Sequence, residues 1–358
     1  MLLKKYLRNS FMESNLKKLI LGSYSFPEVA KLEQVSLGGL MNENYTFITG
    51  GKKYFVKLYK YYPEAKVEIS HAIIDHLISH AIKTYRLVKN NSGKTFSNKN
   101  GVLFEISEFI DDSTNRIEEA VSTKIVGQMA QGLAKYHTAI ADCNVKFNFV
   151  DVFSPEQVKI SFQKIENILV SKTTLDDFDE VCLEMVRTKL SYIEKIPDLT
   201  KNIPFGNFPV LINHGDFLTG NCLFDSNDNL QHVIDFEHTV KTYRLWDIIK
   251  TSAFLARKNK HEIFHSEIDL DVLINFIKNY HAYNFLTWEE VKALPELYMV
   301  ASVLSDFVLY GYYLADNEKA KAVASRNKKE WFWWFDNKDV VREALTRSLT
   351  HINRNGKN

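Results

Sequence analysis

The spacing of apolar residues predicts a β-hairpin in the first part of the chain. Between Val35 and Lys60 the sequence is rich in Val, Ile, Tyr and Phe, which is typical of strands. Two strand candidates, Asn44–Thr49 and Lys53–Tyr59, are separated by Gly50-Gly51. Two consecutive glycines between such runs indicate a tight turn, so the two strands are expected to pair in an antiparallel hairpin.

Helices and further strands are predicted around this hairpin. Residues 14–23 show a short amphipathic pattern, and apolar residues recur at helical spacing from Pro63, which suits a first helical position, to about His80. Further strands are expected at Tyr85–Val88 and Val102–Ile110. The segment between them, residues 90–101, is rich in Asn, Ser and Gly and is expected to be an exposed loop.

Beyond Ile110 the pattern becomes helical, with apolar residues three and four positions apart. The predicted helices are 117–140, 155–169, 175–196, 268–283, 287–316 and the tail. One set of paired strands interrupts them, at 209–213, 222–224 and 232–235. The chain is therefore expected to be an α+β protein of two lobes. We expect a small N-terminal antiparallel sheet lobe over residues 1–106, a linker over 107–112, and a larger, mostly helical C-terminal lobe over 113–358.

The charge of the whole chain argues against a nucleic-acid partner. Its 358 residues carry 45 Lys and Arg against 44 Asp and Glu, a formal net charge of +1, which provides no overall field for a polyanion. The charge is unevenly distributed, since residues 1–105 hold 16 basic against 8 acidic side chains. This asymmetry suits an enzyme that receives a polyanion on one side and a neutral or cationic molecule on the other, and equally suits unevenly placed solvated lysines.

The cysteines and the apolar runs suggest a cytoplasmic protein. The chain has three widely spaced cysteines, Cys143, Cys182 and Cys222, and no Cys-x-x-Cys pair, so neither a disulfide framework nor a zinc knuckle is indicated. Lys, Arg and Glu interrupt the apolar residues at the amino terminus, and no apolar run is expected to span a membrane.

The segment LINHGDFLTGNCLFDSNDNLQHVIDFEH, residues 211–238, contains the side chains that phosphoryl transfer requires. This reaction needs a carboxylate that deprotonates the acceptor hydroxyl, and oxygen ligands that hold Mg²⁺ on the nucleotide phosphates. Asp216, Asn221 and Asp235 lie on predicted loops and provide these groups. Each of them alone is more often a capping or turn residue, so the hypothesis depends on their combination.

These residues carry a resemblance to a known family. HGDFLTGN resembles the catalytic loop of the aminoglycoside phosphotransferase and choline kinase superfamily, and IDFE resembles its metal-binding segment. The resemblance implies a two-lobed, protein-kinase-like fold in which Asp216 is the catalytic base and Asn221 and Asp235 bind Mg²⁺. It also implies that His214 is structural and braces the loop. Glu237 is either a second metal contact through water or an exposed carboxylate without a role.

The resemblance extends to the predicted hairpin. VSLGGLMNENYTF, residues 35–47, is similar to the nucleotide loop of type II homoserine kinases, in which Gly38, Gly39 and Asn42 match a Gly-Gly-x-x-Asn pattern. Glycines there let the backbone approach phosphate oxygens without a clash. Lys57 lies in an otherwise apolar strand, where a lysine either extends to solvent or meets an anion. The family has its phosphate-binding lysine at this point.

The chain departs from the family at the partner of this lysine. Relatives place a Glu on the following helix, and the alignment brings Ser70 to that position. Glu64 and Glu68 are nearby, and Glu68 is the better candidate to pair with Lys57. A solvated glutamate on an exposed face is the alternative.

Weaker matches complete the resemblance. It implies that the linker, with Glu108 and Ile110, hydrogen-bonds adenine through its backbone, and that His137 and Asp247 are structural, with Asp247 holding the catalytic loop. The aromatic run at residues 331–335 resembles a cofactor box but is more typical of a core or interface helix.

The resulting hypothesis is a kinase that uses ATP and Mg²⁺ to phosphorylate a hydroxyl group of a small metabolite. Homoserine or another amino alcohol is the first expectation for the acceptor, and an aminoglycoside or sugar is the alternative, because this superfamily varies its acceptor pocket. A non-catalytic binding protein of the same fold is a second class of function, which the intact Asp216, Asn221 and Asp235 disfavour. A protein kinase is disfavoured because the Gly-x-Gly-x-x-Gly and Ala-Pro-Glu segments are absent from the sequence.

Overall fold

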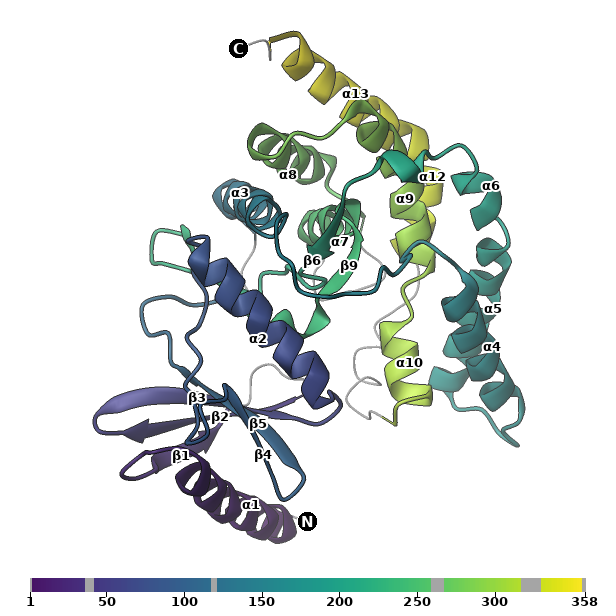
Figure 1. Ribbon diagram of the computed structural model, residues 1–358. Coiled ribbons are helices and arrows are strands. Elements are labelled where there is room, and N and C mark those ends of the chain that lie inside the picture. Colours follow the sequence, from purple (N-terminus) through teal and green to yellow (C-terminus); the bar gives the residue numbers. More distant parts are fainter. Residues whose placement is uncertain (1, 36–41, 117–120, 259–266, 317–329, 356–358) are drawn as a thin grey trace.

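The N-terminal part of the chain is built on one antiparallel sheet with strand order β1-β2-β3-β5-β4 (Figure 1). A computed structural model describes residues 2–35, 42–116, 121–258, 267–316 and 330–355. The strands of this sheet are β1 (Ala30–Gln34), β2 (Asn42–Thr49), β3 (Lys52–Tyr59), β4 (Phe96–Lys99) and β5 (Val102–Glu108).

The predicted hairpin is confirmed. Thr49 of β2 pairs with Lys52 of β3, and the turn between them uses Gly50 and Gly51 with φ of 54° and 76°. Positive φ at both central residues gives the turn whose twist matches the strands, and glycine adopts it without strain. The register places Lys57 opposite Asn44 on one neighbouring strand and Glu105 on the other.

Two helices cover the two faces of this sheet (Figure 1). The first is α1 (Leu2–Ser23), whose Leu16 and Ile20 are buried in one cluster with Phe47 and Phe104 of the sheet. The second is α2 (Glu64–Ser79), whose Val67 is buried in another cluster with Tyr59, Phe96 and Leu103. The helix α2 lies between the sheet and the helical part of the molecule (Figure 1).

Several details of this part differ from the predictions: α1 begins at Leu2 and not near residue 14, and β1 was not predicted. Residues 96–99 form strand β4 and not a loop, because pairing with β5 outweighs the weak strand preference of Ser, Asn and Lys. Residues 85–88 do not form a regular strand, and within them a single residue, Leu87, pairs as a β-bridge with Ser107 of β5. Pro63 occupies the N-cap position that precedes α2, and the first helical residue is Glu64.

The helical part begins after β5 and also contains two small sheets. Its helices are α3 (Thr123–Ala139), α4 (Glu156–Val170), α5 (Asp177–Ile193), α6 (Ile196–Thr200), α7 (Leu245–Ala256), α8 (Leu270–Tyr283), α9 (Trp288–Val303), α10 (Phe307–Tyr313), α12 (Glu330–Asp336) and α13 (Lys338–Asn355). Its strands are β6 (Val210–Asn213), β7 (Cys222–Phe224), β8 (Leu230–Val233) and β9 (Val240–Tyr243). β6 pairs with β9 and β7 with β8, so the three predicted strand segments are present as β6, β7 and β8, whereas β9 was not predicted.

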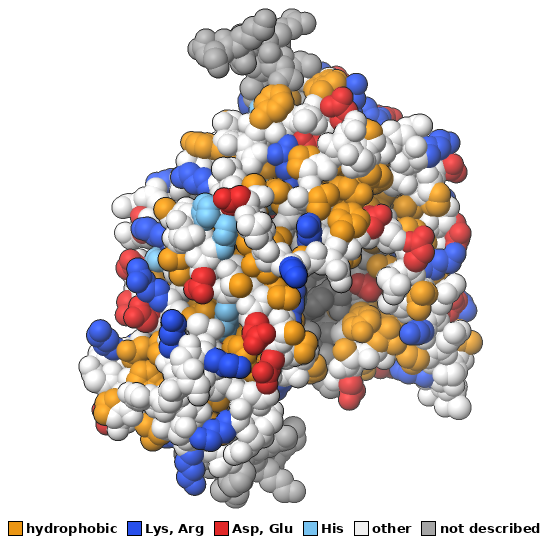
Figure 2. Space-filling view, viewed as in Figure 1, with side chains coloured by type: hydrophobic (Ala, Val, Ile, Leu, Met, Phe, Trp, Pro, Cys, Tyr) orange, Lys and Arg blue, Asp and Glu red, His pale blue; other side chains and the backbone are white. Residues whose placement is uncertain are grey.

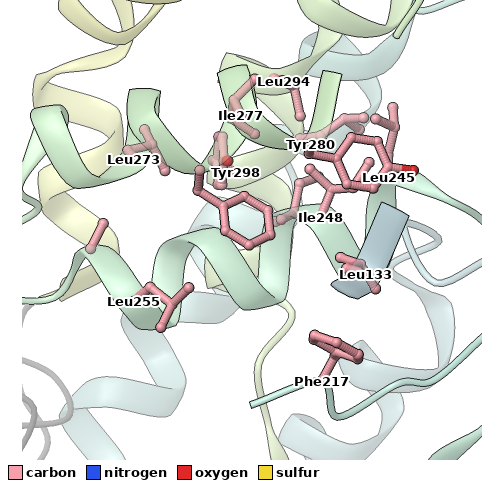
Figure 3. Close-up of a cluster of buried hydrophobic side chains, with 14 of the residues drawn as sticks. Leu133, Phe217, Leu245, Ile248, Leu255, Leu273, Ile277, Tyr280, Leu294 and Tyr298 are labelled. Atoms are coloured by element: carbon pink, nitrogen blue, oxygen red, sulfur yellow. The ribbon is translucent and has the colours of Figure 1, made fainter. Parts of the chain in front are cut away.

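The core of the helical part lies where α3, α7, α8 and α9 meet (Figure 3). Leu133, Ile248 and Leu294 come from three of these helices and are all fully buried. Trp334 of α12 is also buried and stacks on Tyr298 of α9 with ring centroids 4.4 Å apart. The aromatic run near the C-terminus therefore contributes to packing, as expected, and fastens α12 to the core.

One apolar segment has the composition of a membrane span, contrary to expectation. Trp288–Tyr313, which covers α9 and α10, has a mean hydropathy of 1.3 over its most apolar window. However, 59% of that window is buried inside the molecule, and α9 packs against α7, α12 and α13. Its position at the centre of the helical core accounts for its apolar composition.

Candidate active site

A large cavity lies between the sheet and the helical part. Its volume is about 1000 Å³, and its lining includes strands β2, β3 and β5 on one side and α7, α9 and the loops around β6–β9 on the other. Figure 2 shows the molecule hollowed between the two parts, with apolar side chains gathered at the edge of the hollow. Among the predicted site residues, Asn42, Lys57, Glu108, Ile110, Asp216, Asn221 and Asp235 all line this cavity.

The loop after β6 presents Asp216 to the cavity. Gly215 precedes it with φ of 79°, and a Cβ there would collide with the carbonyl oxygen of His238, so this position requires glycine. Asn221 donates from Nδ2 to Oδ2 of Asp216 at 2.7 Å and to its backbone oxygen at 2.9 Å. The amide of Asn221 therefore fixes the orientation of a carboxylate that is 30% exposed to the cavity.

A buried aspartate holds this loop in place. Asp247 accepts hydrogen bonds from the backbone N–H of His214 at 2.7 Å and of Gly215 at 2.8 Å, and it faces His137 at 3.4 Å. Burial opposes ionisation of Asp247, but these donors outweigh it and lower the pKa of its carboxyl. His214 in turn contacts the carbonyl oxygen of Ile234 at 3.0 Å through Nε2. The structural roles expected of His137, His214 and Asp247 agree with these contacts.

The second acidic segment meets Lys57. Asp235 has the left-handed conformation, with φ of 72°, and its Oδ1 lies 2.8 Å from Nζ of Lys57. The same Nζ donates to Oε1 of Glu237, which is 3% exposed. Burial raises the pKa of Glu237, with a further contribution from Asp235, whereas Lys57 overcomes burial and holds the pKa of Asp235 well below its usual range. Of the two alternatives for Glu237, the exposed carboxylate without a role is therefore wrong.

Several buried polar atoms at this end of the cavity have no partner. Within the described residues, Oε2 of Glu237 and the Oδ1 atoms of Asn42 and Asn44 are buried without a hydrogen bond, and all three residues line the cavity. Unpaired buried polar atoms are costly and indicate a missing partner. Carboxylate and amide groups suit a divalent cation and a phosphorylated ligand, since a cation takes the oxygens and an amide can present its N–H₂ to phosphate. The residues present therefore fit a metal-nucleotide complex.

The predicted pair of Lys57 with Glu68 is wrong, because Glu68 is exposed on α2 and Lys57 binds Asp235 and Glu237. At the position where the family has a glutamate, Ser70 donates instead to the carbonyl oxygen of Phe236 at 3.2 Å. The carboxylate of Glu237, from the segment after β8, thus takes the place beside the lysine that the sequence assigned to a helix residue.

A buried glutamate on β5 adds a second link between α2 and the sheet. Glu105 accepts from Tyr59 at 2.5 Å and lies 2.6 Å from Nε2 of His71 on α2. Despite burial, His71 and Lys57 lower the pKa of Glu105. Because Glu105 is opposite Lys57 in the register, α2 is coupled to the lysine strand through His71.

The segment predicted to contact adenine lies at the cavity. Glu108 and Ile110 line the cavity, as does Phe109 between them. The backbone N–H of Glu108 donates to the carbonyl oxygen of Arg86 at 2.9 Å and is thus already satisfied. Gly38 and Gly39 lie outside the described residues.

Lys250 is a charged residue of the site that the sequence did not predict. Lys250 is on α7, one turn after Asp247, and its Nζ donates to the carbonyl oxygen of Gly215 and lies 4.0 Å from Oδ1 of Asp216. The i, i+3 spacing puts both side chains on the face of α7 that meets the catalytic loop. This spacing is the only signal in the sequence, and it becomes informative only once Asp247 is known to contact the loop.

The sequence model of the phosphotransferase enzyme family matches residues 31–294, a range that begins within β1 and ends within α9. This match covers well over half of the chain. The protein belongs to this family. It is a small-molecule kinase, and the resemblance predicted from the two short motifs is confirmed.

Individual relatives agree with this assignment. The homoserine kinase of Methylobacillus flagellatus is 24% identical over 285 residues, 79% of this chain and 80% of that protein. Spectinomycin phosphotransferase, solved with ADP and spectinomycin, superposes with a TM-score of 0.64 at 15% identity, covering 94% of this chain and 98% of its own. The microcompartment-associated aminopropanol kinase gives 0.59 at 13% identity, covering 93% and 100%. The predicted kinase-like fold, a sheet lobe followed by a mostly helical lobe, is confirmed by these structures.

Proposed function

We propose that this phosphotransferase moves the γ-phosphate of ATP to a hydroxyl group of a small metabolite, with Asp216 as the catalytic base. The observation that carries the proposal is the convergence of Asp216, Asn221, Asp235 and Lys57 on one cavity from segments far apart in the sequence. Lys57 contacts the nucleotide phosphates in this proposal, and the backbone of the segment from Glu108 to Ile110 faces the adenine.

The reaction is a direct displacement. Asp216 accepts the proton of the acceptor hydroxyl, the acceptor oxygen forms a bond to the γ-phosphorus, the bond to the β-γ bridging oxygen breaks, and ADP leaves. Asn221 and Asp235 would hold Mg²⁺, which neutralises charge on the phosphates when bound. Asn221 also restrains Asp216 through its 2.7 Å hydrogen bond, so the base is positioned before the acceptor arrives.

Lys250 completes the charge arrangement. Lys57 is already surrounded by Asp235 and Glu237, so its charge is locally compensated. In the described part of the chain, Lys250 forms no ion pair closer than the 4.0 Å contact with Asp216. We infer that Lys250 faces the phosphoryl group during transfer and stabilises its charge beside the negatively charged base.

For the acceptor we propose homoserine or another amino alcohol. The support is the homoserine kinase relative and the fold shared with aminopropanol kinase. The cavity lining also includes Asp306, Trp246 and Phe254, which together offer an ammonium group a carboxyl partner and a hydrocarbon chain an apolar surface. An aminoglycoside-type acceptor is the second candidate, favoured by the cavity volume of about 1000 Å³.

The acceptor is identified by measuring ADP release with Mg²⁺-ATP and a panel of homoserine, 1-amino-2-propanol, ethanolamine, a sugar and spectinomycin. The proposal predicts that one of the amino alcohols stimulates ADP release above the acceptor-free rate and appears as a phosphate ester in the product. Activity with spectinomycin alone would favour the second candidate. If no hydroxylated acceptor stimulates ADP release, while the chain binds ATP, the proposed reaction is wrong.

A further inference from the structure

Two histidines and an aspartate form a cluster on the surface, and none of the three lines the cavity. His76 and His80 are one turn apart on α2, and their rings stack with centroids 4.2 Å apart. Both face Asp142, which follows α3: Nε2 of His76 lies 3.2 Å from Oδ1, and Nε2 of His80 lies 3.3 Å from Oδ2. One ligand atom from each residue lies within 4.8 Å of the others.

The separations match those of a metal site. Zinc takes nitrogen and oxygen ligands at about 2.0–2.1 Å in a tetrahedron, so neighbouring ligand atoms are about 3.3 Å apart. The two imidazole nitrogens lie 3.2 Å and 3.3 Å from the two different oxygens of Asp142, which is close to this value. The Asp142 side chain is 73% exposed, which gives an ion access and leaves room for water as the fourth ligand.

The hydrogen bonds around the cluster indicate which atom of His80 would bind a metal, and they show that His76 would have to lose a proton. Nδ1 of His80 lies 2.9 Å from the carbonyl oxygen of His76 and therefore carries a proton, so Nε2 is the atom that His80 presents to Asp142 and to a metal. Nε2 of His76 lies 2.8 Å from the carbonyl oxygen of Ala139 and therefore bears a proton in the metal-free chain. A bound metal would replace that proton, so binding releases it.

We propose that His76, His80 and Asp142 bind a Zn²⁺-class ion that fastens the end of α2 to the helical part of the molecule. Two imidazoles and one carboxylate favour zinc or a neighbouring transition metal over Mg²⁺ and Ca²⁺, which prefer oxygen ligands only. The site joins the two parts of the chain, because α2 packs on the sheet whereas Asp142 follows α3 (Figure 1). The same helix carries Ser70 and His71, whose hydrogen bonds support the phosphate end of the cavity near Lys57. A metal ion bound by His76, His80 and Asp142 would therefore hold this supporting helix in place.

The test is a titration of the metal-stripped full chain with Zn²⁺ in competition with a chromophoric chelator. The proposal predicts one tightly bound Zn²⁺ per chain, and at least ~10-fold weaker binding in His80→Ala and in Asp142→Asn. Asp75→Asn is the matched control, since it removes an exposed carboxylate from the same helix and should bind Zn²⁺ like the wild type. Calorimetry in two buffers with different ionisation enthalpies should show proton release on binding.

The carboxylates of the cavity are the competing zinc site, and Asp235→Ala separates the two. If Zn²⁺ binds to His76, His80 and Asp142, this variant should still bind one Zn²⁺ per chain tightly. Zn²⁺ should also raise the unfolding temperature of the wild type and of Asp75→Asn but not of His80→Ala. Unchanged Zn²⁺ affinity in His80→Ala and Asp142→Asn, or its loss in Asp235→Ala alone, would overturn the proposal.

Discussion

Removing the carboxylate of Asp247 should destabilise the protein and disable the catalytic loop together. Asp247 is fully buried and accepts two backbone hydrogen bonds, at 2.7 and 2.8 Å, from His214 and Gly215. Hydrogen bonds to a charged group contribute about 1.5–3 kcal/mol each, so Asp247→Ala should cost about 3–6 kcal/mol in the free energy of unfolding. For a chain of 358 residues a loss near the middle of this range lowers the unfolding temperature by about 5 °C.

The assay combines urea unfolding, followed by tryptophan fluorescence, with ADP release. Asp247→Asn keeps one acceptor oxygen and should fall between the wild type and Asp247→Ala in both measurements. Asp271→Asn changes an aspartate in the first turn of α8 that is exposed, so it should leave both unchanged. If Asp247→Ala unfolds within about 0.5 kcal/mol of the wild type, the usual range for surface substitutions, the two hydrogen bonds do not support the loop and the reasoning fails.

Three further predictions concern the cavity. Lys57→Ala should raise the KM for ATP, whereas Glu68→Ala should leave it within error because Glu68 is exposed; an equal rise in both variants would restore the helix ion pair. Asp235→Ala should abolish transfer, and Asn221→Ala should weaken it less because water can replace a neutral ligand, so Mg²⁺ titrations equal to the wild type in both would refute the metal assignment. Lys250→Met should lower kcat by ~10²-fold with the KM for ATP little changed, and a pure rise in KM would show that Lys250 only binds ligand.

The sequence was sufficient to place residues whose positions depend on local order. Asp216, Asn221 and Asp235 lie on loops fixed by short strands and by Gly215, so their spacing along the chain determines where they meet. The hairpin that carries Lys57 was predictable for the same reason, because its two-glycine turn sets the register. Contacts within one or two elements are encoded by patterns that a single sequence displays.

The partners of these residues were not predictable in the same way. By sequence Glu68 was the preferred partner of Lys57, whereas the structure pairs Lys57 with Asp235 and Glu237, because the pairing depends on how α2 docks and on which carboxylates are close to the lysine. The strand β4 has a polar sequence and exists because β5 offers it hydrogen bonds. Lys250 reaches Asp216 only through the packing of α7 on the loop. Each of these features is a tertiary contact, for which local pattern contains no information.

The most direct test of the account is the turnover of Asp216→Asn with the acceptor that gives the highest rate. This change keeps the size of the side chain and removes the proton acceptor, so kcat should fall by a factor of ~10² to 10⁴. Equilibrium binding of ATP should be little changed, because Lys57 and the metal-binding residues are intact. A kcat near that of the wild type would contradict the assignment of Asp216 as the base, and with it the central claim.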